Sequence, residues 1–396
     1  MEIVTTIGWL EPLLPGELLQ ALLDKCDRLQ RETVRLHTLL APHTRERVGA
    51  LLRVTSSFYS NLIEGQYTEP LTLAANAPKR SRKQLTDLAY THMDAQQALE
   101  RALQIHPDYP WSALFSLGFA QRVHERLFVG ASDDDLRLRD GSLMQPGLVR
   151  GEHDNRNVRI GTHVAPDCSI VLPMLERMQA FYGAQQDFRR QLLSALAYHH
   201  RFAWVHPFPD GNGRTLRLIT HLQLQRLGLS SPLWSLSRGL ARRQGEYYER
   251  LGNADQPRRG DLDGRGQLTQ QGLFEFLDFM LDTCLDQVEY MISALGTTAL
   301  RARLESVLRM EPALVKAGIR PEAARALHIL ITQGQVSRSD FKVFLGLGER
   351  LATDQLSRLV AQGLVDSPTP KSRELYPGLP AWFAQQVFPD LHRRFI

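Results

Sequence analysis

Apolar residues recur at helical spacing along most of this chain, a pattern that predicts a mainly α-helical protein. In residues 12–48, leucine, valine and cysteine side chains lie three or four positions apart, with charged residues between them. Residues 85–106 repeat this pattern, and Pro107 and Pro110 close the helix because proline cannot continue one. Further helices are expected at about residues 112–127, 170–182 and 186–204, and from about residue 217 to residue 295.

One segment of the first 300 residues has the alternation typical of strands. In LVRGEHDNRNVRIGTHVAP, residues 148–166, Val158 and Ile160 alternate with polar residues, while Asn155 and Gly161 supply turn chemistry. A small β-hairpin is therefore expected there.

The tail beyond residue 300 reads as helix, short helix, helix, strand, turn and strand, which is the order of a winged helix-turn-helix. Residues 349–362 would be its recognition helix, where Arg350 and Arg358 are available for DNA. Glu349 and Asp354 lie beside them, so a structural or dimerising module is favoured over a DNA-binding one.

Composition places the chain among folded globular proteins and indicates the cellular compartment in which it is expected. The 396 residues are 43% hydrophobic and 23% charged, with a net charge of +4, too small to indicate nucleic-acid binding by itself. No apolar run approaches the roughly 18 residues of a membrane span. Cys26, Cys168 and Cys284 lie far apart, which argues against a disulfide framework or zinc site. A cytoplasmic protein without a membrane partner is expected, because acidic residues and prolines replace the basic start of a signal peptide.

Residues 206–217, HPFPDGNGRTLR, carry the candidate chemistry. The turn Asp210–Gly213 feeds a helix whose N-terminus presents free backbone N–H groups and a positive dipole end, an arrangement that binds anions. Arg214 and Arg217 lie one turn apart and suit phosphate oxygens. Asp210 offers an oxygen ligand for Mg²⁺, and His206 a general base near neutral pH. Each part alone is more often a turn, a packed histidine or a solvated face; their order and spacing together indicate a phosphate site.

This segment resembles the signature of the Fic (Fic/Doc) family, H-x-F-x-(D/E)-G-N-G-R-x-x-R, at every fixed position. Leu216 stands where many members have glycine, at a variable position. The resemblance covers residues 112–295 well and the N-terminal helices more loosely. It implies a Fic-fold helical core at residues 112–297, an N-terminal helical region at 1–111 and a winged helix at 298–396.

The resemblance also implies an activity, the transfer of AMP from ATP to a Ser, Thr or Tyr hydroxyl of a target protein. His206 would take the hydroxyl proton, and Asp210 would hold the Mg²⁺ between the α- and β-phosphates. The backbone N–H groups of the glycine turn and the Asn212 side chain would form an anion hole, and the two arginines would bind the β- and γ-phosphates. The ATP-binding residues implied in this segment are Gly211, Asn212, Gly213, Arg214, Thr215, Leu216 and Arg217.

A second motif lies well upstream. Residues 60–65, SNLIEG, match S/T-x-x-x-E-G/N, the inhibitory helix motif of the same family, through Ser60, Glu64 and Gly65. Ser60 and Glu64 lie one helical turn apart on one face. The glutamate would pair with Arg217, which can bind a carboxylate or a phosphate bidentately but not both. The chain is therefore expected to rest in an autoinhibited state.

Two further assignments follow from the resemblance. Ile160, Gly161, Thr162 and His163 fall in the hairpin flap, where the family's backbone meets nucleotide and target; an ordinary hairpin turn is the alternative. Tyr247 lies in a helix resembling the one that lines the adenine pocket, although a tyrosine pair on a helix is more often core packing.

Other functions stay open at this point. The same signature serves removal of AMP, or transfer of another nucleotide or phosphoryl group, and a nucleotide-sensing DNA-binding regulator or a toxin controlled by a partner is a further alternative. The intact His206 argues against a sensor without catalysis, and the internal SNLIEG segment argues against a separate antitoxin. Self-modification, a homodimer and DNA binding through the tail also stay open.

Overall fold

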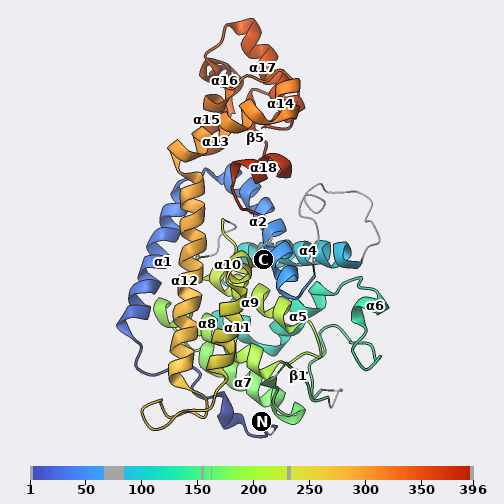
Figure 1. Ribbon diagram of the computed structural model, residues 1–396, viewed down its shortest axis with the longest axis vertical. Coiled ribbons are helices and arrows are strands. Elements are labelled where there is room, and N and C mark those ends of the chain that lie inside the picture. Colours follow the sequence, from blue (N-terminus) through green and yellow to red (C-terminus); the bar gives the residue numbers. More distant parts are fainter. Residues whose placement is uncertain (1–2, 67–83, 153–155, 162, 230–232, 393–396) are drawn as a thin grey trace.

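The computed structural model describes residues 3–66, 84–152, 156–161, 163–229 and 233–392. This part of the chain is built mainly from helices, with strands in two small antiparallel sheets, and the predicted mainly α fold class is confirmed. Figure 1 shows an elongated molecule in which the long helix α12 (Gln270–Leu295) runs along the larger body toward a smaller C-terminal unit.

The N-terminal part of the described chain is helical, as the apolar spacing predicts. Its elements are η1 (Ile7–Leu10), α1 (Gln20–Thr38), α2 (Pro42–Ile63) and α4 (Gln84–Ile105). The helical spacing noted over residues 12–48 is divided between α1 and α2, because Ala41 takes the extended conformation favoured before a proline and Pro42 starts α2. The helix expected at 85–106 is confirmed as α4. The apolar face of α1 packs along α12.

The middle of the chain forms the body around the signature segment. Ser116 caps α5 by accepting a hydrogen bond from the Phe119 N–H (3.1 Å), which divides the helix expected at 112–127. The expected hairpin is confirmed, with Ile160 opposite His163. The elements are η2 (Trp111–Phe115), α5 (Leu117–Leu127), α6 (Asp133–Leu136), β1 (Arg159–Ile160), β2 (His163–Val164), η3 (Cys168–Ile170), α7 (Val171–Tyr182), α8 (Phe188–Val205), α9 (Asn212–Arg226), α10 (Leu236–Arg242) and α11 (Gln244–Ala254).

Helix α8 lies at the centre of this body and delivers the signature. It packs against α7, α9 and α12, and nearly every residue from Leu192 to Val205 is buried. A helix buried on all sides is held rigidly by its neighbours, so its C-terminal end is a well-fixed platform for the residues that follow.

The C-terminal unit contains the expected three helices followed by two strands and, in addition, a short strand between the first two of these helices. Its three-stranded sheet has the order β3–β5–β4, with both pairs antiparallel. The elements are α13 (Thr297–Met310), α14 (Pro312–Lys316), α15 (Ala323–Gln333), β3 (Val336–Ser337), α16 (Arg338–Leu345), α17 (Glu349–Ala361), β4 (Val365–Asp366), β5 (Glu374–Pro377) and α18 (Ala381–Val387).

This unit is attached to α2 at both ends of that helix. Near the start of α2, the Thr44 hydroxyl donates to the Ile331 carbonyl (2.7 Å), and Arg47 forms an ion pair with Asp366. Toward its end, Thr55 forms a hydrogen bond with His392 (2.8 Å). Helix α2 is thus held between the C-terminal unit and the body.

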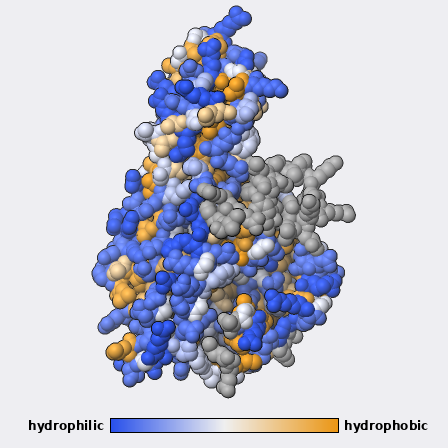
Figure 2. All heavy atoms as spheres, viewed as in Figure 1, coloured by the Kyte–Doolittle hydropathy of each residue, from blue (hydrophilic) through white to orange (hydrophobic). Residues whose placement is uncertain are grey.

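Hydrophobic and hydrophilic residues are intermixed on the visible surface (Figure 2). On the face drawn in Figure 2, hydrophobic residues lie in small groups among hydrophilic ones. Among the helices that the structure describes, none combines the length and apolar character that a membrane crossing requires.

Candidate functional site

The signature histidine lies directly after α8, held by a buried arginine. His206 adopts the left-handed conformation (φ 50°), and Pro207 prevents the helix from continuing. The guanidinium of Arg150, which is fully buried, donates to the carbonyls of Val205 and His206, both at 2.9 Å. Because these carbonyls have no partner within the helix, Arg150 satisfies them and fixes the direction in which His206 leaves it.

The environment of His206 keeps its ring neutral. The pKa of His206 is lowered to about 3, first by burial and then by the charge of Arg150 and by His163, while a hydrogen bond to the backbone of Ala203 and the charge of Glu64 act in the opposite direction. A neutral imidazole has a free lone pair at physiological pH. His206 is therefore in the state that a general base requires.

The loop between His206 and α9 is closed by the side chain of Asn212. Its Oδ1 accepts from the Phe208 N–H (2.9 Å), and its Nδ2 donates to the Phe208 carbonyl (2.7 Å). Sequence analysis expected this side chain to bind phosphate; in the structure both of its polar atoms are used within the loop. Gly211 has φ 75°, and a Cβ there would lie 2.6 Å from the Phe128 ring, so only glycine fits.

A residue that sequence reasoning missed, His124 on α5, ties this loop to the body. Its Nδ1 accepts from the Gly147 N–H (2.9 Å), so the Nε2–H donates to the Asp210 carbonyl (3.0 Å). Its ring stacks on Phe208 at 3.9 Å between centroids. Burial lowers the pKa of His124 to about 4. Nothing in the local sequence distinguishes His124, because its partners lie 23 and 86 residues away.

Acidification should destabilise the fold through His124. In the unfolded chain this histidine takes up a proton near pH 6.5, whereas the folded pKa of about 4 keeps the ring neutral, so stability is lost as the pH falls below about 6.5. The expected loss is up to about 1.4 kcal/mol per pH unit for this one group. Urea unfolding at pH values from 7 to 5 measures it, with His124→Gln as comparison. Glutamine supplies a donor and an acceptor without titrating, so equal pH slopes in both proteins would contradict the assignment.

The anion site at the start of α9 is filled by a carboxylate of the same chain. The first N–H groups of a helix have no partner within it. A Cβ added to Gly213 would lie 2.2 Å from Glu64 Oε1, so the carboxylate lies directly against this first turn. The side chain of Glu64, which follows the last residue of α2, remains 35% exposed. The expected meeting of Glu64 with the signature helix is thus present in the structure.

Arg217 is bound by two residues of the SNLIEG segment, Ser60 and Glu64. Its Nη2 donates to Glu64 Oε1 (2.7 Å) and to the Ser60 carbonyl (2.8 Å), and its Nε donates to Ser60 Oγ (3.0 Å). The Arg217 side chain is only 2% exposed. Gly65, the last residue of the motif, takes φ 77° and ends the helix with its N–H bonded to the Leu62 carbonyl (2.9 Å).

Arg214 has different partners from Arg217. Its guanidinium lies 4.7 Å from the centre of the Phe128 ring, and its Nη2 lies 3.8 Å from Asp210 Oδ2.

Asp210 itself is exposed in the cleft. Mg²⁺ binds proteins through one or two carboxylates together with substrate phosphates, so one exposed carboxylate beside a phosphate site fits it. The described residues contain no cluster of three or more His, Cys, Asp or Glu for a protein-only metal site.

Three of the residues predicted to contact ATP do not line the cleft. The side chains of Thr215 and Leu216 are buried on the inner face of α9. Tyr247 is 3% exposed and bonds through its hydroxyl to His199 Nε2 (2.8 Å), behind Arg217 rather than in the cleft. Neighbouring residues on a helix point about 100° apart, so Tyr248 is the exposed member of the pair at 48%. Tyr248 donates to the Ile63 carbonyl (3.1 Å), next to Glu64.

The flap residues divide between the cleft and its support. Ile160 and Gly161 line the cleft that also contains His206. His163 does not face it: its Nε2 donates to the Trp204 carbonyl (2.8 Å), so this side chain anchors the flap to α8. Thr162 lies outside the described residues.

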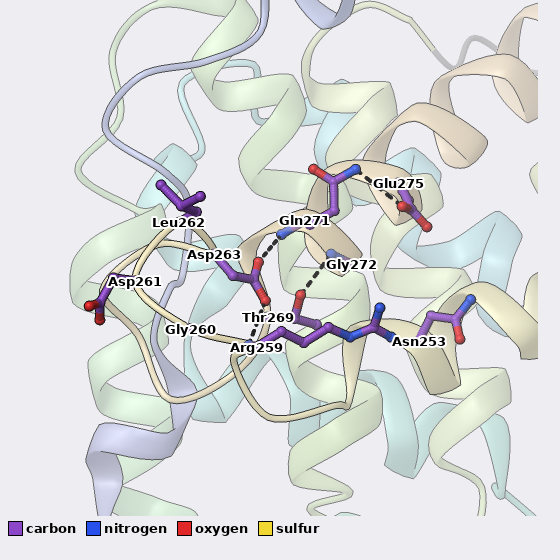
Figure 3. Close-up of a pocket in the computed structure, with 10 residues that line it drawn as sticks. All are labelled: Asn253, Arg259, Gly260, Asp261, Leu262, Asp263, Thr269, Gln271, Gly272 and Glu275. Carbon is purple, nitrogen blue, oxygen red and sulfur yellow. Dashed lines mark hydrogen bonds between the residues drawn. The ribbon is translucent and has the colours of Figure 1, made fainter.

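These groups surround one cleft of about 570 Å³, whose lining includes Glu64, His206, Asp210, the turn 211–213 and the flap. A second hollow, of about 640 Å³, lies beside the loop that precedes α12 (Figure 3). There the Asp263 carboxylate accepts from the backbone N–H groups of Arg259 (3.0 Å) and Gln271 (2.8 Å), so it stabilises the loop. The chemistry therefore converges on the first cleft.

Comparisons with known proteins match the segment that carries the signature. The model of the Fic/DOC family matches residues 114–224. Over 79 residues the chain is 33% identical to "Protein adenylyltransferase Fic" of Culex quinquefasciatus and 32% identical to that of Drosophila persimilis. Each match covers 20% of this chain and only 16% of the relative's length.

Solved structures extend the likeness to the fold. A Fic family protein from Desulfovibrio desulfuricans G20 aligns over 92% of this chain and 98% of its own, with a TM-score of 0.51 and 19% identity. Fic-1 from C. elegans, residues 134–508, aligns over 70% of this chain and 74% of its own, with a TM-score of 0.51 and 17% identity. Helix α8, the signature turn and all of α9 except its last two residues lie within residues 114–224, the segment that matches the Fic/DOC family model.

Proposed function

We propose that this chain transfers AMP from ATP to a Ser, Thr or Tyr hydroxyl of a protein target. The observation that carries the proposal is the neutral His206 in the same cleft as the N-terminus of α9. That pairing supplies a base and an anion site a few residues apart. The relatives named protein adenylyltransferase support it over the shared 79 residues.

The reaction needs one proton transfer and one displacement at phosphorus. His206 accepts the hydroxyl proton as the oxygen attacks the α-phosphate, the bond to the bridging oxygen breaks, and pyrophosphate leaves. The backbone N–H groups at the start of α9 and the Arg214 guanidinium stabilise the phosphate charge. Asp210 is the residue that would hold Mg²⁺, which supplies neutralisation of phosphate charge when bound.

The Glu64 contact makes the resting state an inhibited one in this proposal. Its carboxylate lies against Gly213 and on Arg217, where the γ-phosphate of a productively bound ATP would be held. One edge of the Arg217 guanidinium cannot bind the Glu64 carboxylate and the γ-phosphate at the same time. Wild-type chain would therefore bind ATP unproductively until α2 moves.

The C-terminal unit is proposed to be a winged helix that supports α2 rather than one that reads DNA. Arg358, one of the two basic residues on α17, is engaged by Asp354 (2.7 Å) and by the Ala317 carbonyl (2.6 Å). Lys342 is paired with Glu349. The hydrogen bonds and ion pair between this unit and α2 support a role in setting the position of Glu64.

One observation favours a second reaction, the removal of AMP from a modified protein. Glu64 is part of the cleft lining beside His206, where a carboxylate can orient water for attack on a phosphodiester. Mass measurement of peptides incubated with each nucleoside triphosphate separates the two reactions and also tests other nucleotides as donors.

Intact mass spectrometry of acceptor peptides identifies the transferred group. The Glu64→Gly chain is incubated with Mg²⁺, a pool of Ser-, Thr- and Tyr-containing peptides, and each nucleoside triphosphate in turn. A mass gain of one AMP with ATP is expected. A gain of phosphate alone would contradict AMP transfer, and a larger gain with another triphosphate would change the donor. Wild-type chain that releases AMP from the modified peptides would establish the second reaction.

A further inference from the structure

The active-site cleft is lined by more positive charge than the signature accounts for. Besides the residues already described, its lining includes one further carboxylate, Asp140, and four arginines, Arg137, Arg139, Arg156 and Arg159, here called the arginine rim. Two of them follow α6 and two lie in the segment that leads into and forms β1 of the flap. None of the four belongs to the Fic signature or to the inhibitory motif.

Two members of the arginine rim form ion pairs with acidic residues, and the other two form none with the residues that the structure describes. Arg156 forms an ion pair with Asp140 (3.0 Å) and donates to Ser142 Oγ (2.9 Å). Arg137 Nε lies 3.9 Å from Asp134 Oδ1. Arg139 and Arg159 are exposed and form no ion pair with any residue that the structure describes. Their charge is available to an anion that enters the cleft mouth.

The nucleotide already has its own cations. Arg214 and Arg217 are buried, lie on α9, and stand beside the helix N-terminus. Arg139 and Arg159, by contrast, are solvent-exposed and belong to a loop and the flap. Exposed charges around a charged cleft steer and select partners more than they add affinity, so the rim suits a macromolecular acceptor.

The flap places an apolar side chain next to the arginine rim. In β1, Arg159 is followed by Ile160, whose side chain is 40% exposed. Successive residues of a strand point to opposite faces, so the arginine and the apolar side chain present two different contacts to a neighbouring segment. Both residues line the cleft with His206.

We propose that the arginine rim selects the acceptor: the target segment carries Asp or Glu side chains beside the hydroxyl that receives AMP. The acidic side chains contact Arg139 and Arg159 while the hydroxyl reaches His206. This inference rests on the proposed function and names its substrate class, an acidic segment of a protein.

The test uses three synthetic peptides that present the same Ser, Thr and Tyr acceptors. The flanking residues are Asp and Glu in the first, Asn and Gln in the second, and Lys in the third. With the Glu64→Gly chain, ATP and Mg²⁺, kcat/KM should be roughly tenfold higher for the acidic peptide than for the neutral one, and lowest for the lysine peptide. Added salt should reduce the preference, because both partners are exposed.

Charge reversal locates the effect. Arg139→Glu with Arg159→Glu should abolish or invert the preference through the peptide KM and leave the KM for ATP unchanged. Arg325→Glu, an exposed arginine on α15 outside the cleft, is the matched control and should keep the preference.

The outcomes separate the inference from the function on which it rests. Equal rates for the three peptides, or labelling of the chain itself but of no peptide, would overturn the acidic-target inference alone. A raised KM for ATP with every peptide in the reversed variant would overturn it as well, since the arginines would then serve the nucleotide. No transfer of AMP to any peptide or to the chain would overturn the proposed function too.

Discussion

Replacing Glu64 by glycine should raise the rate of AMP transfer roughly 10- to 100-fold over the wild-type chain, a change of about 1.4–2.7 kcal/mol. The substitution removes the carboxylate from Arg217 Nη2 and from the first turn of α9, which frees both for the γ-phosphate. Initial rates of label transfer from ATP to the peptide pool measure the effect.

Glu64→Gln is the matched control for this prediction. The amide keeps a hydrogen-bond acceptor near Arg217 but loses the charge, so its rate should fall between those of wild type and Glu64→Gly. Ser60 still contacts Arg217 in both variants, which keeps the guanidinium in place. Equal rates in all three proteins would show that the Glu64 contact does not limit the reaction.

Replacing His206 should remove most of the activity that Glu64→Gly releases. In that background we expect His206→Asn to lower kcat/KM by about 10²–10⁴, the usual contribution of a general base, with little change in ATP affinity. Asparagine is chosen because it tolerates the left-handed conformation observed at this position, whereas alanine does not. Steady-state kinetics and equilibrium binding of ATP separate the two effects.

The fold of this variant is checked by its thermal unfolding. A protein that unfolds at the same temperature but retains full activity would contradict the assignment of His206 as the base. A protein that loses ATP binding together with activity would instead place His206 in the nucleotide site.

The parts of the site that follow one another along the chain were predicted from sequence. Residues 206–217 fold as a helix end, a turn and a new helix because proline, two glycines and an asparagine leave few other conformations. The pairing of Glu64 with Arg217 was also predicted, although 153 residues separate them, because each belongs to a recognisable motif. The hairpin was found through its alternation and its turn glycine.

Sequence could not show which faces the helices turn inward. Thr215, Leu216 and Tyr247 belong to segments near the site, yet their side chains point away from the cleft because packing sets the rotation of α9 and α11. Arg150 and His124 support the loop from distant segments, and no local pattern marks a buried arginine that binds carbonyls. The break between α1 and α2 was missed although Pro42 marks it, because the apolar spacing continues across it.

The most direct test of the account compares two positions of radioactive label in ATP. Glu64→Gly chain and Glu64→Gly, His206→Asn chain are each incubated with Mg²⁺, the peptide pool and ATP labelled at either the α- or the γ-phosphate. Peptides should gain label from the α-phosphate only, and the His206→Asn substitution should lower the rate of this labelling by at least about 100-fold. Label from the γ-phosphate, or α-label that survives the loss of His206, would contradict it.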